Sequence, residues 1–199
     1  RLEGLPPTYC LTLQGETVRQ EETQRQFQKY GADVRFHFGF DGRKVDFRTQ
    51  SHVVTGEYFK DMSSGDVACC LGHLSMIRLW LRESDSDIAL FVEDDINLEN
   101  CENWSFTWQE MVAQLPTDWK AMQLALIRSD PINEVRCRKR VTADWCVTAY
   151  ILRREYAQWL VDQYWADRFA IAHLHTPKDP RAIPIVENCV YFPAEPHVY

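Results

Sequence analysis

Apolar residues form an uninterrupted run in the middle of the chain, at residues 88–92, and three carboxylates follow directly at residues 93–95. A run of this length, with β-branched and aromatic residues, is typical of a strand buried on both faces of a sheet. Adjacent carboxylates in a partly desolvated site repel one another unless a cation lies among them. Open α/β sheets also bind their ligands beyond the carboxyl ends of strands. The pattern therefore predicts a central strand with a divalent metal site at its end.

A second interpretation of the acidic segment is a loop that caps the next helix, since Asp95 and Asn97 are both common N-cap residue types. The position directly after a buried strand favours the metal site over this alternative. Oxygen ligands suit Mg²⁺ or Mn²⁺ better than Zn²⁺. The expected cation is therefore Mn²⁺ or Mg²⁺.

Predicted strands and helices alternate along the rest of the chain. Strand character at residues 8–13 and 34–40 flanks a polar helix at 16–29, and this order favours a parallel strand pair with a right-handed crossover. An apolar stripe at helical spacing predicts a helix over residues 67–82. The remaining expected elements are a short helix near 57–62, helices at 104–115 and 153–165, an exposed excursion at 128–142, and strands at 121–127, 147–152 and 183–191.

The composition is that of an ordinary globular protein, and 199 residues are expected to form a single domain over residues 1–199. The formal net charge is −7 and there is no basic block, which argues against nucleic acid or an anionic membrane as the main partner. No apolar run approaches the ~18 residues of a transmembrane helix. Neither a transmembrane segment nor a signal peptide is expected.

The seven cysteines are an odd number and include no Cys-x-x-Cys pair. Buried free thiols are the favoured interpretation, and a zinc site is not expected. Free thiols indicate a reducing compartment, so a cytoplasmic location is expected.

Three segments together resemble glycosyltransferase family 25, which includes lipopolysaccharide-type sugar transferases and collagen galactosyltransferases. They are Phe-Gly-Phe-Asp-Gly at residues 38–42, Gly-Asp-Val-Ala-Cys-Cys-Leu-Gly-His-Leu at 65–74 and Phe-Val-Glu-Asp-Asp-Ile at 91–96. A weaker match is Ala-Tyr-Ile-Leu at 149–152. The resemblance covers roughly residues 8–167, with Asp66 in place of the family's glutamate and Gly72 in place of its usual serine.

The resemblance implies a GT-A-like fold, a single Rossmann-like α/β/α sandwich with a central, mostly parallel mixed sheet. A nucleotide-sugar would lie over the strand ends, with Mn²⁺ or Mg²⁺ at the acidic triplet. Asp95 is then the primary metal ligand, while Glu93 and Asp94 act through bound water or hold hydroxyls of the donor. His197, or else His173 or His175, could complete the coordination sphere.

The nucleotide of such a fold crosses the end of the first strand, here Thr12, Leu13 and Gly15. Gly15 would let the backbone approach a ligand closely. Arg19, at the start of the following helix, could pair with a phosphate, or it could be a solvated helix charge. The family motif adds Asp66 and His73 to the candidate donor-binding residues, although a lone histidine on a helix is more often structural.

The expected reaction transfers a hexose from a nucleoside-diphosphate sugar, with uridine as the expected nucleoside, to a hydroxyl of a glycan or glycoprotein acceptor. The family resemblance implies inversion, which needs a general base within hydrogen-bond reach of the acceptor hydroxyl. The candidate bases are Asp167, which is preferred, then Asp144 and Glu187.

Two other functions stay open at this point. One is a different metal-dependent phosphate enzyme, either a nucleotidyltransferase or a phosphohydrolase, although the chain has no Gly-x-x-x-x-Gly-Lys element. The other is an inactive GT-A-like binding module, against which the intact acidic triplet argues. The sequence sets no oligomeric state.

Overall fold

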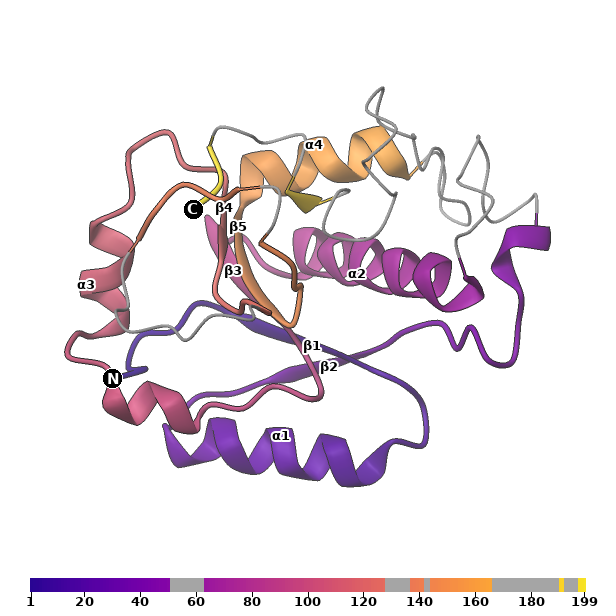
Figure 1. Ribbon diagram of the computed structural model, residues 1–199, viewed down its shortest axis with the longest axis horizontal. Helices are drawn as coiled ribbons and strands as arrows, with labels where there is room; N and C mark the ends of the chain where they lie inside the picture. Colours follow the sequence, from indigo (N-terminus) through magenta and orange to yellow (C-terminus); the bar gives the residue numbers. More distant parts are fainter. Residues whose placement is uncertain (51–62, 128–136, 142–143, 166–189, 192–196) are drawn as a thin grey trace.

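The computed structural model describes residues 1–50, 63–127, 137–141, 144–165, 190–191 and 197–199. Within them it contains five strands, four α-helices and two short 3₁₀ turns (Figure 1). In chain order these are β1 (Thr8–Thr12), α1 (Thr17–Lys29), β2 (Arg35–Phe38), η1 (Phe47–Thr49), α2 (Ser64–Glu83), β3 (Ile88–Glu93), η2 (Glu99–Asn103), α3 (Trp108–Ala113), β4 (Ala121–Gln123), β5 (Ala149–Arg153) and α4 (Arg154–Tyr164).

The five strands form one sheet in the order β2-β1-β3-β5-β4. Strand β1 pairs in parallel with both β2 and β3, whereas β5 runs antiparallel to β3 and to β4. The predicted parallel β-α-β opening is therefore confirmed, and the apolar run at residues 88–92 lies in the central strand. The whole is a mixed α/β fold of the Rossmann-like kind, as expected.

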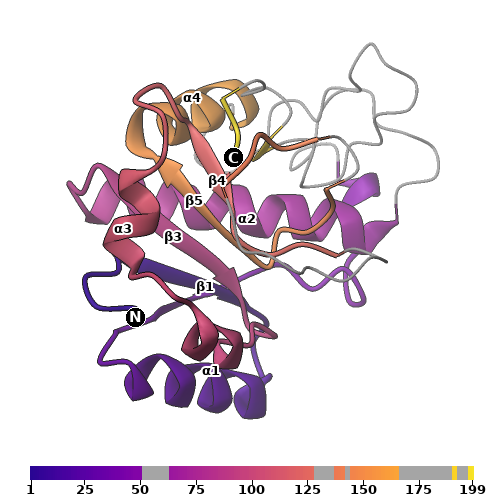
Figure 2. The ribbon, with the colours of Figure 1, turned by 60° about the vertical axis from the view of Figure 1, so that its left-hand side comes forward.

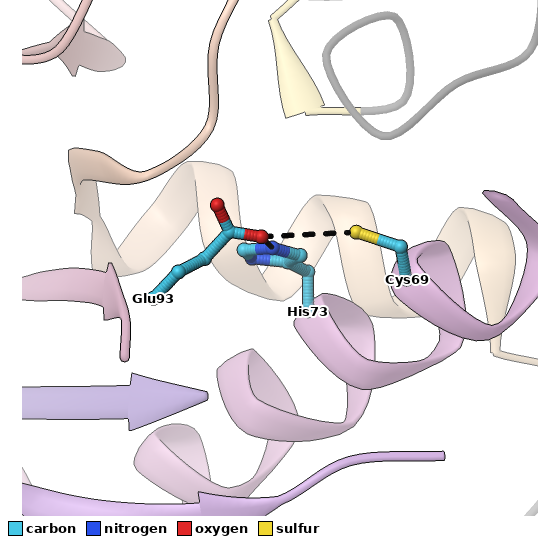
Figure 3. A group of neighbouring side chains, drawn as sticks. All are labelled: Cys69, His73 and Glu93. Atoms are coloured by element: carbon cyan, nitrogen blue, oxygen red, sulfur yellow. Dashed lines mark hydrogen bonds and ion pairs between the residues drawn. The ribbon is translucent and has the colours of Figure 1, made fainter. Parts of the chain in front are cut away.

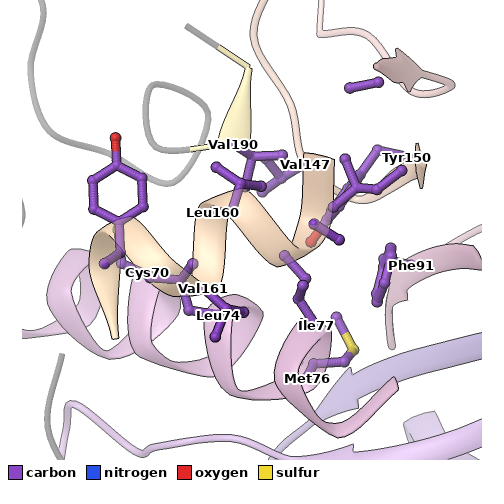
Figure 4. Packing of buried hydrophobic residues seen from close by; sticks show 14 of the residues in the cluster. Cys70, Leu74, Met76, Ile77, Phe91, Val147, Tyr150, Leu160, Val161 and Val190 are labelled. Carbon is purple, nitrogen blue, oxygen red and sulfur yellow. The ribbon is translucent and has the colours of Figure 1, made fainter. Parts of the chain in front are cut away.

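Helices α2 and α4 cover one face of the sheet, and α1 and α3 cover the other (Figures 1 and 2). Side chains alternate between the faces along a strand. Accordingly, Phe91 packs with the α2–α4 core, while Leu90 and Val92 pack with Phe27 of α1. Figure 4 shows the interface between α2 and α4, where Leu74 and Ile77 meet Leu160 and Val161.

Aromatic rings form a row across the middle of the sheet on the α2 face. Tyr9, Phe91 and Tyr150 come from β1, β3 and β5 and stand in register. Their ring centroids are 6.1 Å apart for Tyr9 and Phe91 and 5.2 Å apart for Phe91 and Tyr150. Trp80 of α2 meets Phe91 edge-on at 5.6 Å. This row of rings packs α2 against β1, β3 and β5.

Capping boxes set the starts of two helices. Ser63 Oγ accepts a hydrogen bond from the backbone N–H of Asp66, and the Asp66 carboxylate accepts one from the Ser63 N–H, so α2 begins at Ser64. Thr107 and Glu110 form the same arrangement at α3. Helix α3 therefore begins at Trp108, four residues later than predicted.

Several elements differ in length from those predicted. The central strand agrees with the prediction to within one residue: it ends at Glu93, where the Ile96 N–H donates to the Glu93 carbonyl at 3.2 Å. The strand predicted at 121–127 leaves the sheet after Gln123. Of the strand predicted at 183–191, only the last two residues are described, and neither is in a strand. The short helix near 57–62 lies outside the described residues, as does most of the excursion at 128–142.

Candidate active site

The carboxyl ends of β1 and β3 lie side by side at one edge of the sheet. Leu11 is in register with Glu93, and the Asp94 N–H donates to the Leu11 carbonyl at 3.1 Å. Parallel pairing thus brings Thr12 and Leu13 next to the acidic triplet. This sheet edge, at the carboxyl ends of the strands, is where open α/β sheets bind their ligands.

A pocket of about 440 Å³ opens at this edge. It is walled by the ends of β1 and β3, the start of α1, the segment after β2 and the first turns of α2. The sequence-predicted residues among its lining are Thr12, Leu13, Arg19, Glu93, Asp94 and Asp95, and further polar residues are Glu16, Asp41, Arg43 and Cys69. The structure thus brings six of the predicted site residues together.

The carboxylate of Asp94 is fully engaged by neighbouring elements. Its Oδ2 accepts a hydrogen bond from Thr12 Oγ1 at 2.6 Å, and its Oδ1 lies 3.1 Å from Arg19 Nη1. The Asp94 side chain is 10% exposed, while Arg19 is 55% exposed and lines the pocket. Arg19 is therefore held at the pocket wall by Asp94 and is not simply a solvated helix charge.

Asp95 has no side-chain hydrogen bond or ion pair with any other residue in the described part of the chain, and it is exposed at the pocket. Partial burial and then the negative charge of Glu93 raise its pKa, with Arg19 acting in the opposite direction. A bound cation would relieve this repulsion. Asp95 is thus the carboxylate of the triplet best placed to be a metal ligand.

Glu93 faces α2, where it meets His73 (Figure 3). His73 Nε2 lies 3.4 Å from Glu93 Oε1, and Thr148 Oγ1 donates to Glu93 Oε2 at 3.0 Å. Burial alone would raise the pKa of Glu93, but the bonds from His73 and Thr148 outweigh it and lower the pKa. The negative charge of Glu93 is therefore stabilised mainly by neighbouring protein groups.

His73 is completely buried, with its Nδ1 atom 2.9 Å from the hydroxyl of Tyr150. Burial alone would lower its pKa, yet Tyr150, Cys69 and Glu93 together raise it well above the usual value. His73 does not line the pocket itself. It lies behind the Glu93 carboxylate and fixes its position.

Gly15 lies in the turn after β1, beside the pocket residues Leu13 and Glu16, but is not itself among the pocket lining. Gly15 has φ +98 and open space around its α-carbon, and Gln20 Nε2 donates to the Leu13 carbonyl at 3.0 Å. A side chain at Gly15 would be strained in this conformation.

One polar cluster in the pocket was missed by the sequence reasoning. Arg43 donates to both oxygens of Asp41, at 2.8 and 3.1 Å, and reaches Glu16 at 3.4 Å. In the sequence, residues 41–42 entered the resemblance as part of the segment 38–42, and no role in the site was predicted for them. The position of this Asp-Gly turn after a strand parallel to β1 was the available clue, because such a turn lies at the same sheet edge as Gly15.

Other predicted residues lie away from the pocket or have a different partner. The Asp66 carboxylate caps α2 and is not among the pocket lining. Asp144 is buried, and Arg138 donates to both of its carboxylate oxygens, at 2.5 and 2.8 Å. A carboxylate held in this way is poorly suited to act as a base. Neither Asp95 nor Asn97 is the N-cap of the next helical turn, because Leu98 holds that position before η2. The Asn97 side chain accepts a hydrogen bond from the Glu99 N–H at 2.8 Å.

His197 lies at the opposite end of the sheet. Its carbonyl accepts from the Lys120 N–H, and its Nδ1 atom lies 2.8 Å from Asp118. Lys120 precedes β4, whose first residue aligns through β5 with the amino end of β3. The structure thus separates His197 from the acidic triplet by the length of β3. The other candidates, Asp167, Glu187, His173 and His175, lie outside the described residues.

The fold and the pocket define the class as an α/β protein with a pocket at the carboxyl ends of parallel strands, lined by carboxylates and arginines. The family model described as glycosyltransferase family 25 (LPS biosynthesis protein) matches residues 5–174. The chain belongs to this family and is by family a glycosyltransferase. No curated protein matches the chain.

Six of the seven cysteines are described, and all six are free thiols. Cys137 is exposed and Cys69 is half-buried, while the others are buried. Among the described helices, none is both long and apolar enough to cross a bilayer.

Proposed function

We propose that the chain transfers a hexose from a nucleoside-diphosphate sugar, with a uridine nucleotide as the expected donor, to a hydroxyl of a glycan or glycoprotein. The observation that supports this proposal is the pocket beside β1 and β3, which brings two arginines together with Asp95, a carboxylate that has no side-chain partner among the other described residues. In this proposal the diphosphate lies over the turn at Gly15 and against Arg19. The free donors of the Arg19 guanidinium then face the phosphates while Asp94 holds it in place.

The charge of the pocket supports a role for a divalent cation. Two arginines among the lining are outnumbered by the five carboxylates Glu16, Asp41, Glu93, Asp94 and Asp95. A diphosphate would be repelled by such a wall unless a cation offset the charge. Asp95 would hold Mn²⁺ or Mg²⁺, which when bound supplies a Lewis acid for the departing diphosphate. Asp94, whose two oxygens are held by Thr12 and Arg19, and Glu93, which faces His73 and Cys69, would contribute to this Mn²⁺ or Mg²⁺ site mainly by position.

The acceptor hydroxyl must lose its proton as the new glycosidic bond forms. Among the three carboxylates predicted as base, Asp144 is committed to Arg138. Asp167 and Glu187 therefore remain as the proposed candidates, with direct displacement and inversion as the expected course. A reducing compartment such as the cytoplasm agrees with the free thiols and stays part of the proposal.

The test is a donor screen in which nucleotide-sugars are incubated with Mn²⁺, Mg²⁺ or EDTA and release of nucleoside diphosphate is measured. We expect release from one donor class in the presence of metal, and loss of release in Asp95→Asn. Asp87→Asn is a matched control, because it removes an exposed carboxylate at the other end of the same strand. Equal turnover in EDTA would refute the metal, and no turnover with any donor would favour the binding-module alternative.

A further inference from the structure

A group of three side chains of types that bind metals lies at the pocket wall and directly behind it. The proposed function assigns no metal to this group. Cys69 and His73 are one turn apart on α2, so their side chains share a face of the helix. Glu93 reaches them from the end of β3. The Cys69 Sγ, a ring nitrogen of His73 and a carboxylate oxygen of Glu93 all lie within 4.8 Å of one another (Figure 3).

The distances among these atoms suit a small tetrahedral ion. Glu93 Oε1 is 3.4 Å from His73 Nε2 and 3.9 Å from Cys69 Sγ. Zinc bond lengths of about 2.0–2.3 Å place neighbouring ligand atoms of a tetrahedral site roughly 3.3–3.6 Å apart. Bringing the three atoms around one ion therefore requires only small side-chain movements.

Outer groups already hold two of the three ligands in a binding orientation. The Tyr150 hydroxyl lies against His73 Nδ1 at 2.9 Å, which leaves Nε2 directed toward Glu93. Thr148 Oγ1 donates to the other carboxylate oxygen of Glu93 at 3.0 Å. Hydrogen bonds of this kind, from the far side of a histidine and a carboxylate, are the usual support of metal ligands.

We propose that Cys69, His73 and Glu93 form a binding site for a thiophilic divalent cation of the Zn²⁺ type. Cys69 and Glu93 both line the pocket, so the fourth coordination position faces it. On binding, the Cys69 thiol releases its proton to solvent as the sulfur–metal bond forms. His73 binds through Nε2, which first releases to solvent the proton that it shares with Glu93 in the metal-free protein. The ring keeps its other proton on Nδ1, next to the Tyr150 oxygen.

This site is distinct in chemistry from the one proposed at Asp95. Sulfur and imidazole ligands select Zn²⁺, whereas carboxylate and water select Mg²⁺ or Mn²⁺. The two sites lie in one pocket, but the zinc site depends on no assumption about sugar transfer. The sequence argued against zinc from its odd number of cysteines and its lack of a Cys-x-x-Cys pair, and neither feature bears on a site with one cysteine, one histidine and one glutamate.

The experiment adds Co²⁺, as a spectroscopic substitute for Zn²⁺, to the metal-free full chain. We expect one equivalent to produce a thiolate-to-cobalt charge-transfer band and the intense visible bands of four-coordinate Co²⁺, both abolished by one equivalent of Zn²⁺. Cys69→Ser should lose the charge-transfer band and weaken Zn²⁺ binding at least about tenfold. Cys137→Ser, which removes an exposed thiol, and Asp95→Asn should leave the band unchanged.

A measurement on the unaltered chain covers the case in which Cys69→Ser does not fold. Each cysteine is alkylated with and without Zn²⁺ and the modified peptides are quantified. We expect Zn²⁺ to slow modification of Cys69 at least about tenfold and to leave Cys137 unaffected. Absence of a charge-transfer band in the unaltered chain, or protection of another cysteine in place of Cys69, would overturn the site.

Discussion

Arg19 of α1 and Asp94 at the end of β3 form an ion pair across 75 positions of sequence, with Nη1 3.1 Å from Oδ1. Thr12 donates to the other oxygen of the same carboxylate at 2.6 Å. One aspartate therefore ties the first helix to two strand ends and sets the direction of an arginine that lines the pocket. This relationship separates two roles within the acidic triplet, positioning by Asp94 and ligation by Asp95.

The first prediction concerns Arg19. Arg19→Ala should weaken nucleoside diphosphate binding by roughly 1.5–3 kcal/mol, the range for a hydrogen bond to a charged group. Arg25→Ala is the matched control, because Arg25 lies on the same helix, pairs with Glu22 and does not line the pocket. Calorimetric titration of nucleoside diphosphate with Mn²⁺ present measures both. Equal dissociation constants for Arg19→Ala and the unaltered chain would remove Arg19 from the site.

A second prediction contrasts the two aspartates in the absence of metal. Asp95→Asn should leave the free energy of unfolding unchanged or slightly higher, because burial and the charge of Glu93 already disfavour its carboxylate. Asp94→Asn should lower it by roughly 1–3 kcal/mol, since Thr12 and Arg19 lose a charged acceptor. Urea unfolding curves measure both variants. A larger loss in Asp95→Asn than in Asp94→Asn would reverse the roles assigned here.

The third prediction tests the core beneath the site. Leu74 is 1% exposed and packs in the cluster between α2, α4 and the sheet. Leu74→Ala should lower the free energy of unfolding by roughly 2–5 kcal/mol. Val18→Ala, at a residue 78% exposed on α1, is the control and should change it by no more than about 0.5 kcal/mol. Similar values for the two variants would show that Leu74 is not part of a tightly packed core.

A fourth prediction concerns two glycines that face each other across the pocket rim. A β-carbon on Gly42 would lie 2.6 Å from the Ser64 carbonyl oxygen and 2.9 Å from the Gly65 α-carbon. Gly42→Ala must push the start of α2 away and should cost roughly 1–3 kcal/mol of stability. Gly65→Ala meets only Ser63 Oγ at 3.4 Å and should be tolerated. Thermal unfolding of both variants tests this, and a neutral Gly42→Ala would contradict the close approach.

The fifth prediction is a pH dependence. The hydrogen bonds from Arg43 lower the pKa of Asp41 to about 2. Because this pKa lies below the unfolded value of about 3.9, the pair stabilises the fold above that pH, and the contribution is lost as the pH falls toward 2.

In Arg43→Ala the Asp41 pKa should return toward its ordinary value, while Lys44→Ala should move it less, since Lys44 lies 3.5 Å away. Carbon-detected NMR titration of the Asp41 carboxyl measures each pKa. An ordinary pKa for Asp41 in the unaltered chain would contradict the bidentate pair.

Local patterns carried enough information to predict the sheet and its covering helices. The apolar run before Glu93 has one stable position in an α/β fold, at the centre of the sheet, and the order of elements then sets the parallel partners. Helix boundaries were less well predicted, although the Thr107–Glu110 capping box was present in the sequence and would have corrected the start of α3.

The hydrogen-bond and ion-pair partners of the carboxylates in the site could not be predicted from local patterns. Whether a carboxylate is free or engaged depends on groups far away in sequence, such as Thr12 and Arg19 for Asp94. Nothing local distinguishes Asp94 from Asp95. The bidentate pair between Asp144 and Arg138 likewise became visible only once the chain was folded.

The row of rings formed by Tyr9, Phe91 and Tyr150 has an optical consequence. Aromatic side chains held in fixed, asymmetric surroundings give a near-ultraviolet circular dichroism signal, which is lost when specific packing is lost even if helices remain. Tyr150 belongs both to this row and to the hydrogen bond with His73. The near-ultraviolet signal of these rings should therefore fade when the sheet separates from α2, whether or not the far-ultraviolet signal has changed. The same separation would break the hydrogen bond between Tyr150 and His73 that holds His73 behind the pocket.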